Sequence, residues 1–103
     1  MNEVQLQLNN HGEGKFFIMD GDEQIGEMGV ALDGDILTVH HTEVLEKAEG
    51  KGYAKQLLTA MVDHARQNSW KVVPLCPYVH LQFRRHPDDY ADIWLRDQEG
   101  QQR

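Results

Sequence analysis

The sequence predicts an α/β (α+β) fold in which an antiparallel four-stranded meander is followed by a helix, a parallel strand and short C-terminal helices. Three observations predict this class. Short β-prone runs, several with apolar and polar residues alternating, fill residues 4–44, with turn residues between them. The apolar spacing changes to a helical period at Ala54. A short apolar run, residues 71–75, follows that helix.

The first half of the chain predicts four strands joined by short turns. These strands are residues 4–9, 15–19, 24–32 and 36–44. The Asp-Gly pairs at 20–21 and 33–34 tolerate the positive φ that a hairpin loop requires. Because the turns between successive strands are short, an antiparallel meander is the simplest topology.

The second half predicts an amphipathic helix and a strand that returns to the sheet. One apolar stripe at helical spacing comprises Ala54, Leu57, Leu58, Met61, Val62 and Ala65. Residues 71–75 then predict a buried strand beside residues 36–44, and a single helical crossover favours parallel pairing. Short helical segments are expected at 79–85, ending before Pro87, and at 88–95.

Length and charge limit the classes of protein to consider. The 103 residues are expected to form one domain, 1–103, with residues 96–103 as a frayed polar end. Ten Lys and Arg against seventeen Asp and Glu give a net charge of −7, which disfavours a nucleic-acid partner. A chain this small with an exposed sheet edge is expected to be a monomer or a weak homodimer.

Localisation is predicted from what the sequence lacks. No apolar run approaches the ~20 residues of a membrane-spanning helix, so no membrane partner is expected. Residues 1–5 do not have the pattern of a signal peptide. A lone Cys76 excludes an intramolecular disulfide. We therefore expect a cytoplasmic protein.

The first chemical motif is Glu49-Gly50-Lys51-Gly52-Tyr53-Ala54, between a predicted strand and the amphipathic helix. Glycines let successive backbone N–H groups turn outward, and the start of a helix favours an anion such as a phosphate. A plain turn that uses glycine for its backbone angles is the alternative. The motif is not a Walker loop, because the Gly-x-x-x-x-Gly-Lys-Ser/Thr pattern is absent.

Cysteine and histidine supply the next candidates. Cys76 follows the last predicted strand, where open α/β sheets bind ligands, although a free cysteine is more often a small buried hydrophobe. Of His40 and His41, only one can face a given site, as a base or thiolate partner or as a solvated side chain. The spacing of Cys76, His80 and His86 matches no common zinc pattern, so no metal is expected.

An aromatic and basic group follows Cys76. Tyr78, Phe83, Arg84 and Arg85 stand beside the predicted anion site and are candidates to clamp a nucleotide. The alternative is that Phe83 belongs to the core and that the arginines are solvated.

The order of these elements resembles the GNAT acyl-CoA-dependent N-acetyltransferases, and more closely their small stand-alone, YidJ-type members. Three stretches carry the resemblance: 41–44 (His-Thr-Glu-Val), 50–57 (Gly-Lys-Gly-Tyr-Ala-Lys-Gln-Leu) and 73–79 (Val-Pro-Leu-Cys-Pro-Tyr-Val). It covers nearly all of residues 3–95. It implies a compact GNAT-like fold with acetyl-CoA or CoA as co-substrate, and an acetyl group that moves to an amine of a small molecule or a protein.

The resemblance also implies where coenzyme A binds: the pantetheine arm pairs with the fourth strand, and the pyrophosphate rests on the glycine turn. The implied binding residues are Thr42, Glu43, Val44, Gly50, Lys51, Gly52, Tyr53, Ala54, Lys55, Tyr78 and Phe83. The sequence departs from the superfamily pattern twice. Glu49 stands where an Arg or Gln is usual, and Phe83 where many members have a tyrosine that acts as a general acid.

Two routes to acetyl transfer follow, with Cys76 and His41 as the implied catalytic residues. In the direct route an amine attacks the thioester, and His41 or a water that it orders removes the proton. In the covalent route Cys76 takes the acetyl group first. Both remain open, and we favour the direct route with Cys76 near the thioester.

The acceptor side is expected to be open, because residues 9–14 form only a turn where the superfamily carries helices. The acidic surface favours a cationic acceptor. Two other functions fit the same residues: a CoA- or acyl-CoA-binding module or sensor without significant turnover, and an interaction domain that keeps only the fold.

Overall fold

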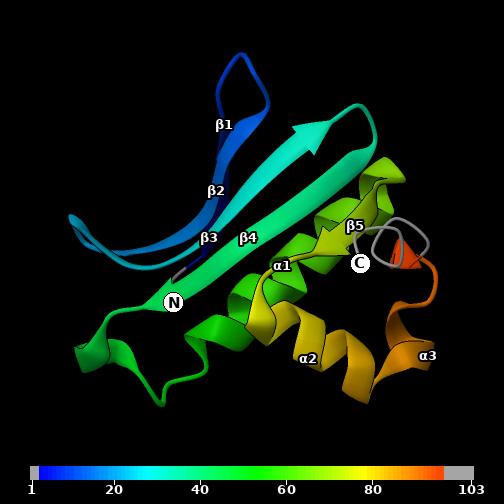
Figure 1. Ribbon diagram of the computed structural model, residues 1–103. Coiled ribbons are helices and arrows are strands. Elements are labelled where there is room, and N and C mark those ends of the chain that lie inside the picture. The colour runs from blue at the N-terminus through cyan, green and yellow to red at the C-terminus, as the bar shows by residue number, and fades with distance from the viewer. Residues whose placement is uncertain (1–2, 97–103) are drawn as a thin grey trace.

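A five-stranded mixed sheet, in the order β1-β2-β3-β4-β5, forms the centre of the computed structural model, which describes residues 3–96 (Figure 1). The strands are β1 (Val4–Leu8), β2 (Glu13–Asp20), β3 (Glu23–Asp33), β4 (Ile36–Val44) and β5 (Lys71–Pro74). The helices are η1 (Glu46–Ala48), α1 (Tyr53–Asn68), α2 (Pro77–Arg85) and α3 (Pro87–Tyr90). Strands β1 to β4 pair antiparallel and β5 pairs parallel with β4, so the predicted fold class is confirmed.

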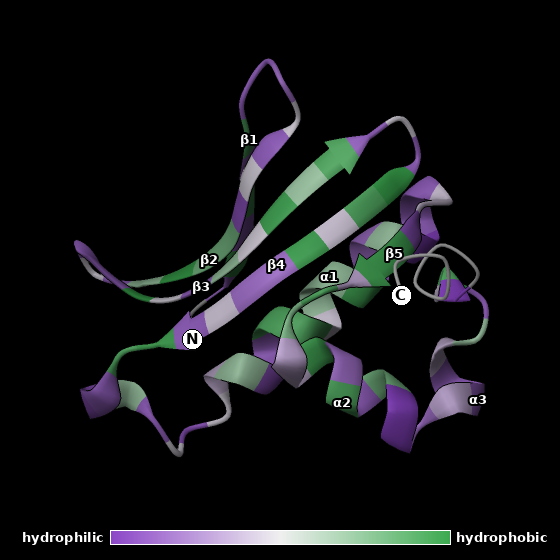
Figure 2. Ribbon diagram, in the orientation of Figure 1, coloured by the Kyte–Doolittle hydropathy of each residue, from purple (hydrophilic) through white to green (hydrophobic). Residues whose placement is uncertain are grey.

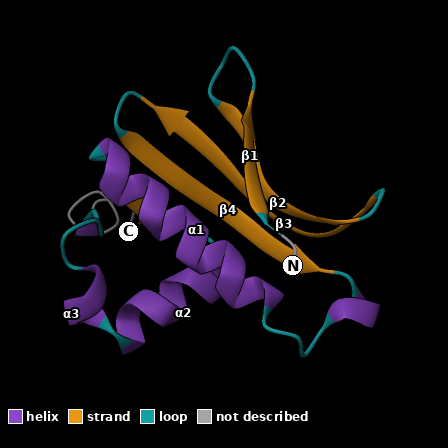
Figure 3. Cartoon of the chain, turned by 180° about the vertical axis from the view of Figure 1, so that it is seen from behind, coloured by secondary structure: helices purple, strands orange, loops and turns teal. Residues whose placement is uncertain are grey.

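The two longer helices, α1 and α2, lie against one face of the sheet (Figures 1 and 3). We call this the inner face; Phe16, Met28 and Leu37 point into it and are fully buried. The opposite, outer face carries Lys15 and Gly29. In the part of the chain that the structure describes, no helix covers the outer face (Figure 3).

Helix α1 buries the stripe that its sequence predicts. Its buried residues are Leu57, Leu58, Met61, Val62 and Ala65. A stripe of this width on one helix supplies the apolar area that makes packing on a sheet favourable. Because the stripe faces the sheet, the first turn of the helix comes to lie beside the end of β4.

The C-terminal part of the described chain differs from the prediction in detail. Helix α2 begins at Pro77 rather than at Val79, because a proline at the start of a helix loses no hydrogen bond. Of the predicted segment 88–95, only residues 88–90 are helical, as part of α3. Trp94 instead forms a parallel bridge with Val72 of β5, which shields the edge of that short strand. The expected frayed end, apart from Arg96, lies outside the described residues.

Candidate functional site

Strand β4 has two halves with different neighbours. Its first half pairs with β5 from Ile36 to Val39, where Val39 lies opposite Pro74. The pairing ends there: the Cys76 backbone N–H donates to the Val39 carbonyl at 2.9 Å, and the chain then enters α2. Among the described residues no strand pairs with residues 40–44 on this side. We call residues 40–44 the open half of β4, because its backbone groups on this edge are available to a ligand.

A β-bulge at His40 decides which face each side chain of the open half occupies. Val39 lies opposite Val30 and His41 lies opposite Gly29, so His40 is an extra residue in β4. Such an insertion bends the strand and changes the direction of the side chains that follow. Thr42 therefore lies toward the inner face and His41 toward the outer face, the reverse of strict alternation from Val39.

The inner cleft is a cavity of about 340 Å³ between the open half of β4, the start of α1 and the start of α2. Its lining residues are Thr42, Val44, Ala48, Glu49, Gly50, Gly52, Tyr53, Ala54 and Tyr78. Seven of the residues that the sequence marked for coenzyme A binding thus share one cavity. Segments far apart in the sequence meet here, so the cavity is a product of the tertiary fold.

The wall of the inner cleft at α1 is a turn with two glycines in the left-handed region. Gly50 has φ 81° and Gly52, the N-cap of α1, has φ 83°. A Cβ atom placed on either glycine would meet no heavy atom within 4 Å, so both glycines border open space. No side chain caps the helix, and its first N–H groups lie beside the cleft. This geometry suits an anion.

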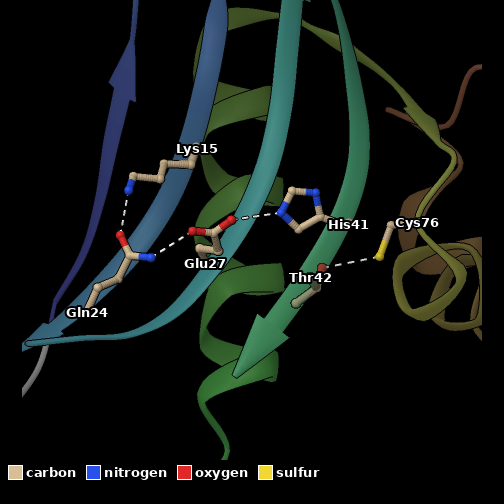
Figure 4. Close-up of polar contacts among 6 residues, drawn as sticks. All are labelled: Lys15, Gln24, Glu27, His41, Thr42 and Cys76. Carbon is tan, nitrogen blue, oxygen red and sulfur yellow. Dashed lines mark hydrogen bonds and ion pairs between the residues drawn. The ribbon is translucent and has the colours of Figure 1, made fainter. Parts of the chain in front are cut away.

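Cys76 lies next to the cleft, behind Thr42 of its wall. Its side chain is only 2% exposed, and its Sγ lies 3.2 Å from the Thr42 Oγ1 (Figure 4). Tyr78, the second residue of α2, is half-buried and lines the cleft. Burial raises the pKa of its phenol, with smaller contributions from Tyr90 and Cys76, so the group stays protonated at neutral pH.

His41 lies on the outer face and does not contact Cys76. Its Nε2 is 2.8 Å from Oε2 of Glu27, and this hydrogen bond is the largest cause that lowers the pKa of the Glu27 carboxyl (Figure 4). The expectation that His41 partners the Cys76 thiol is therefore wrong. The bulge at His40 separates the two side chains and leaves Thr42 as the polar neighbour of the sulfur.

Other candidates from the sequence lie outside the inner cleft. Phe83 is fully buried and stacks on Tyr90 with ring centroids 4.5 Å apart, so its assignment to the cofactor site is corrected to the core. Glu43 is exposed beside His41, while Lys51 and Lys55 are exposed next to the glycine turn. None of these three residues lines the inner cleft.

Two residues that contact His41, Glu27 and Gly29, were not predicted from the sequence. Glu27 is an ordinary polar position of a strand, and nothing in the pattern links it to His41. Gly29 carried a signal, because glycine inside a strand often marks a close approach of another group. A Cβ on Gly29 would lie 2.3 Å from Cε1 of His41, so the imidazole lies directly on the backbone at this glycine.

Two features are absent from the described residues. Within residues 3–96, no group of three or more His, Cys, Asp or Glu side chains is placed to hold a metal ion. None of the helices described is long and apolar enough to cross a membrane.

Comparison with known proteins gives one family. A family model described as GCN5-related N-acetyl-transferase matches residues 15–93. The match includes the open half of β4, the glycine turn and Cys76. No curated protein matches the sequence.

Three solved structures are similar to the chain. A GCN5-like protein from Staphylococcus aureus is 28% identical, with a TM-score of 0.65 over 92% of this chain and 91% of its own. A ribosomal-protein-alanine N-acetyltransferase from Brucella melitensis is 24% identical, with a TM-score of 0.57 over 75% and 59%. One from Escherichia coli is 12% identical, with a TM-score of 0.58 over 64% and 43%. At these identities the last two support the fold alone.

Proposed function

This chain belongs to the GCN5-related N-acetyltransferase family, and we propose that it transfers the acetyl group of acetyl-CoA to a primary amine. The observation that carries the proposal is the inner cleft. It joins an unpaired strand edge and a glycine turn at the start of α1 in one cavity, and a buried thiol lies 3.2 Å from Thr42 in the wall of that cavity. These features match the three parts of the donor: an amide-rich arm, a pyrophosphate and a thioester.

The residues present fit coenzyme A by their chemistry. The backbone groups of the open half of β4, around Thr42 and Val44, are available to pair with the pantetheine amides. The backbone amides from Gly50 to Lys55 are available to the pyrophosphate, with the positive end of α1 behind them. Bound there, acetyl-CoA supplies an acyl group activated as a thioester.

The side chains favour the direct route over an acetyl-cysteine. A reactive cysteine needs access and a group that lowers its pKa, but Cys76 is 2% exposed and His41 lies on the other face of β4. The Tyr78 phenol, protonated and on the cleft wall, is suited to donate a proton to the departing sulfur. Tyr78 would thus supply the general acid that many family members have at the position of Phe83, which lies in the core of this protein.

The position of Glu49 supports a second candidate function. Its carboxylate lines the inner cleft beside the glycine turn, where it opposes a phosphate. A protein that binds CoA or acyl-CoA weakly, without significant turnover, would have the same cleft. Binding and turnover therefore have to be measured separately.

Thermal unfolding with acetyl-CoA or CoA tests the binding step. A ligand that binds only the folded state adds about 2.7 kcal/mol of stability at a hundredfold excess over Kd. We expect a higher melting temperature with either ligand, and no change for Gly52→Arg, whose side chain fills the cleft. Release of CoA in the presence of amines then separates an enzyme from a binding module.

Gly34→Arg is the matched control for Gly52→Arg. Gly34 has φ 64°, and a Cβ there also meets no heavy atom within 4 Å. The substitution therefore introduces similar backbone strain in the turn between β3 and β4, away from the cleft. It should keep the shift caused by acetyl-CoA. No shift for the wild-type protein at millimolar ligand would overturn the proposal.

A further inference from the structure

A second cavity, which we call the outer pocket, lies on the other side of β4. It has a volume of about 380 Å³. Its polar lining comprises Gln7, Asn9, Glu13, Lys15, Glu27 and His41. His41 and Thr42 are neighbours in β4, so one stretch of strand forms a wall of both cavities.

Charge in the outer pocket favours a cation. Glu13 and Glu27 contribute carboxylates and Lys15 contributes an ammonium group. The Lys15 ammonium is already engaged, since it donates to Oε1 of Gln24 at 2.6 Å and lies 5.1 Å from the centre of the Phe17 ring. Among the described residues, Glu13 makes no ion pair. The Lys15 charge still acts on Glu27, but the two carboxylates outnumber it, so the pocket attracts an incoming ammonium group.

The imidazole of His41 is held in one orientation. It lies on the Gly29 backbone, and its Nε2 donates to Glu27. Glu27 is fixed in turn by the Gln24 side-chain amide, which donates to its Oε1 at 2.7 Å (Figure 4). With Nε2 as the donor, the lone pair of the neutral ring is on Nδ1. A base that is oriented by a carboxylate is a recurring arrangement for proton removal.

We propose that the outer pocket binds the acceptor as a primary ammonium, with Glu13 and Glu27 as its counter-charges, and that Glu27 positions His41 to receive its proton. This inference rests on the proposed acetyl transfer and names its acceptor class and its base. Glu27 is a positioning residue, because it acts through His41.

The transfer balances with these groups. One ammonium proton goes to Nδ1 of His41, and the freed lone pair forms a C–N bond with the acyl carbon. The C–S bond of the thioester breaks, and its electron pair leaves on sulfur. Tyr78 gives its phenol proton to that sulfur and takes the second proton of the nitrogen in return, so the products are the amide, the thiol form of CoA and one proton released from His41.

Among the described residues that line the outer pocket or lie beside His41, the charged groups are carboxylates with one exception, Lys15. Glu27 comes from β3, Glu13 and Lys15 come from β2, and Glu43 lies next to it on β4, opposite Glu27. From β1 only uncharged side chains line the pocket. This surrounding charge favours an ammonium ligand.

Three amines with similar aliphatic chains test the acceptor class: putrescine, butylamine and γ-aminobutyrate. At the end opposite the reacting amine, putrescine has an ammonium group, butylamine has a methyl group and γ-aminobutyrate has a carboxylate group. CoA release is measured with each amine at saturating acetyl-CoA and low salt. We expect kcat/KM to be highest for putrescine, lower for butylamine and lowest for γ-aminobutyrate. Equal rates for the three amines, or a preference for γ-aminobutyrate, would overturn the outer pocket as the acceptor site, because a pocket with two carboxylates discriminates between these far ends.

Two variants test the roles within the pocket. Because general base catalysis contributes about 10²–10⁴-fold, Glu27→Gln should lower kcat at least about tenfold and leave KM for acetyl-CoA unchanged. Glu13→Gln should raise KM for putrescine about threefold or more with kcat nearly unchanged, because it removes one counter-charge. Glu23→Gln is the control, since Glu23 is also on β3 and paired with a lysine, but lies outside both cavities.

A binding measurement separates this inference from the proposed function. With CoA bound, putrescine should shift the NMR signals of the His41 ring in the wild-type protein and far less in Glu13→Gln. If acetyl-CoA stabilises the protein but Glu27→Gln reacts like wild type and putrescine leaves His41 unchanged, the outer pocket is not the acceptor site. If acetyl-CoA neither binds nor reacts, the proposed function itself fails.

Discussion

The two halves of β4 belong to one strand but have different neighbours and different chemistry. Residues 36–39 pair with β3 on one side and β5 on the other, and Leu37 and Val39 are fully buried. Within the described part of the chain, residues 40–44 pair only with β3, and they carry His40, His41 and Thr42. Figure 2 shows the same change along β4, from hydrophobic at its start to hydrophilic near its end.

The difference shows how a short strand creates a site on a longer one. Strand β5 covers four residues of β4 and then turns into α2, so the edge that it leaves uncovered is both polar and accessible. The bulge at His40 stands at the same point and directs one polar side chain to each face. Stability is concentrated in the paired half and the candidate chemistry in the open half.

The largest expected effect comes from the paired half. Leu37→Ala leaves a cavity under α1 and should lower the free energy of unfolding by about 2–5 kcal/mol. The matched change in the open half, Val44→Ala, removes a side chain that is only partly buried and should cost about 1 kcal/mol. Urea unfolding measures both. Equal losses would contradict the division of β4 into two halves.

Cys76 lies where the two halves meet, and Cys76→Ala has an intermediate expected effect. The lost packing and the lost contact with Thr42 should reduce stability by about 1–2 kcal/mol. On the direct route turnover should stay within about tenfold of wild type, equivalent to about 1.4 kcal/mol. Intact-mass analysis of the wild-type protein with acetyl-CoA completes the test. An acetyl adduct on Cys76, with turnover abolished in the stable variant, would establish the covalent route instead.

The smallest expected effect is the pH dependence of the Glu27–His41 pair in the open half. The hydrogen bond to His41 lowers the pKa of Glu27 below its ordinary value of 4.5. The unfolded chain therefore binds more protons near that pH, so this contribution is present above pH 4.5 and is lost as the pH falls through the folded value.

Urea unfolding at several pH values measures this contribution against Glu27→Gln. Because the pair is partly exposed to solvent, wild type should lose less than about 1 kcal/mol more than the variant between neutral and acid pH. Parallel stability curves for the two proteins would show that the pair contributes nothing to the folded state.

Sequence pattern predicted most of the fold because the elements follow local rules. The meander follows from short β-prone runs and turns, and α1 follows from its apolar stripe. The glycine turn was recognisable as a candidate anion site because glycine at a strand-to-helix junction has a local meaning. The family resemblance identified acetyl-CoA as the donor and assigned both Tyr78 and Cys76 to the region of its binding site.

What only the tertiary structure decided is which side chains meet. Alternation along β4 cannot reveal an extra residue at His40, so the pairing of His41 with Glu27 rather than Cys76 was not predictable. Phe83 looked like a site residue until the packing of Tyr90 showed that it belongs to the core. Periodicity is set by the local backbone, so the sequence determined the elements and their inner stripes. Register and bulges depend on the partner strand, and they determine which side chains of β4 line each of the two cavities.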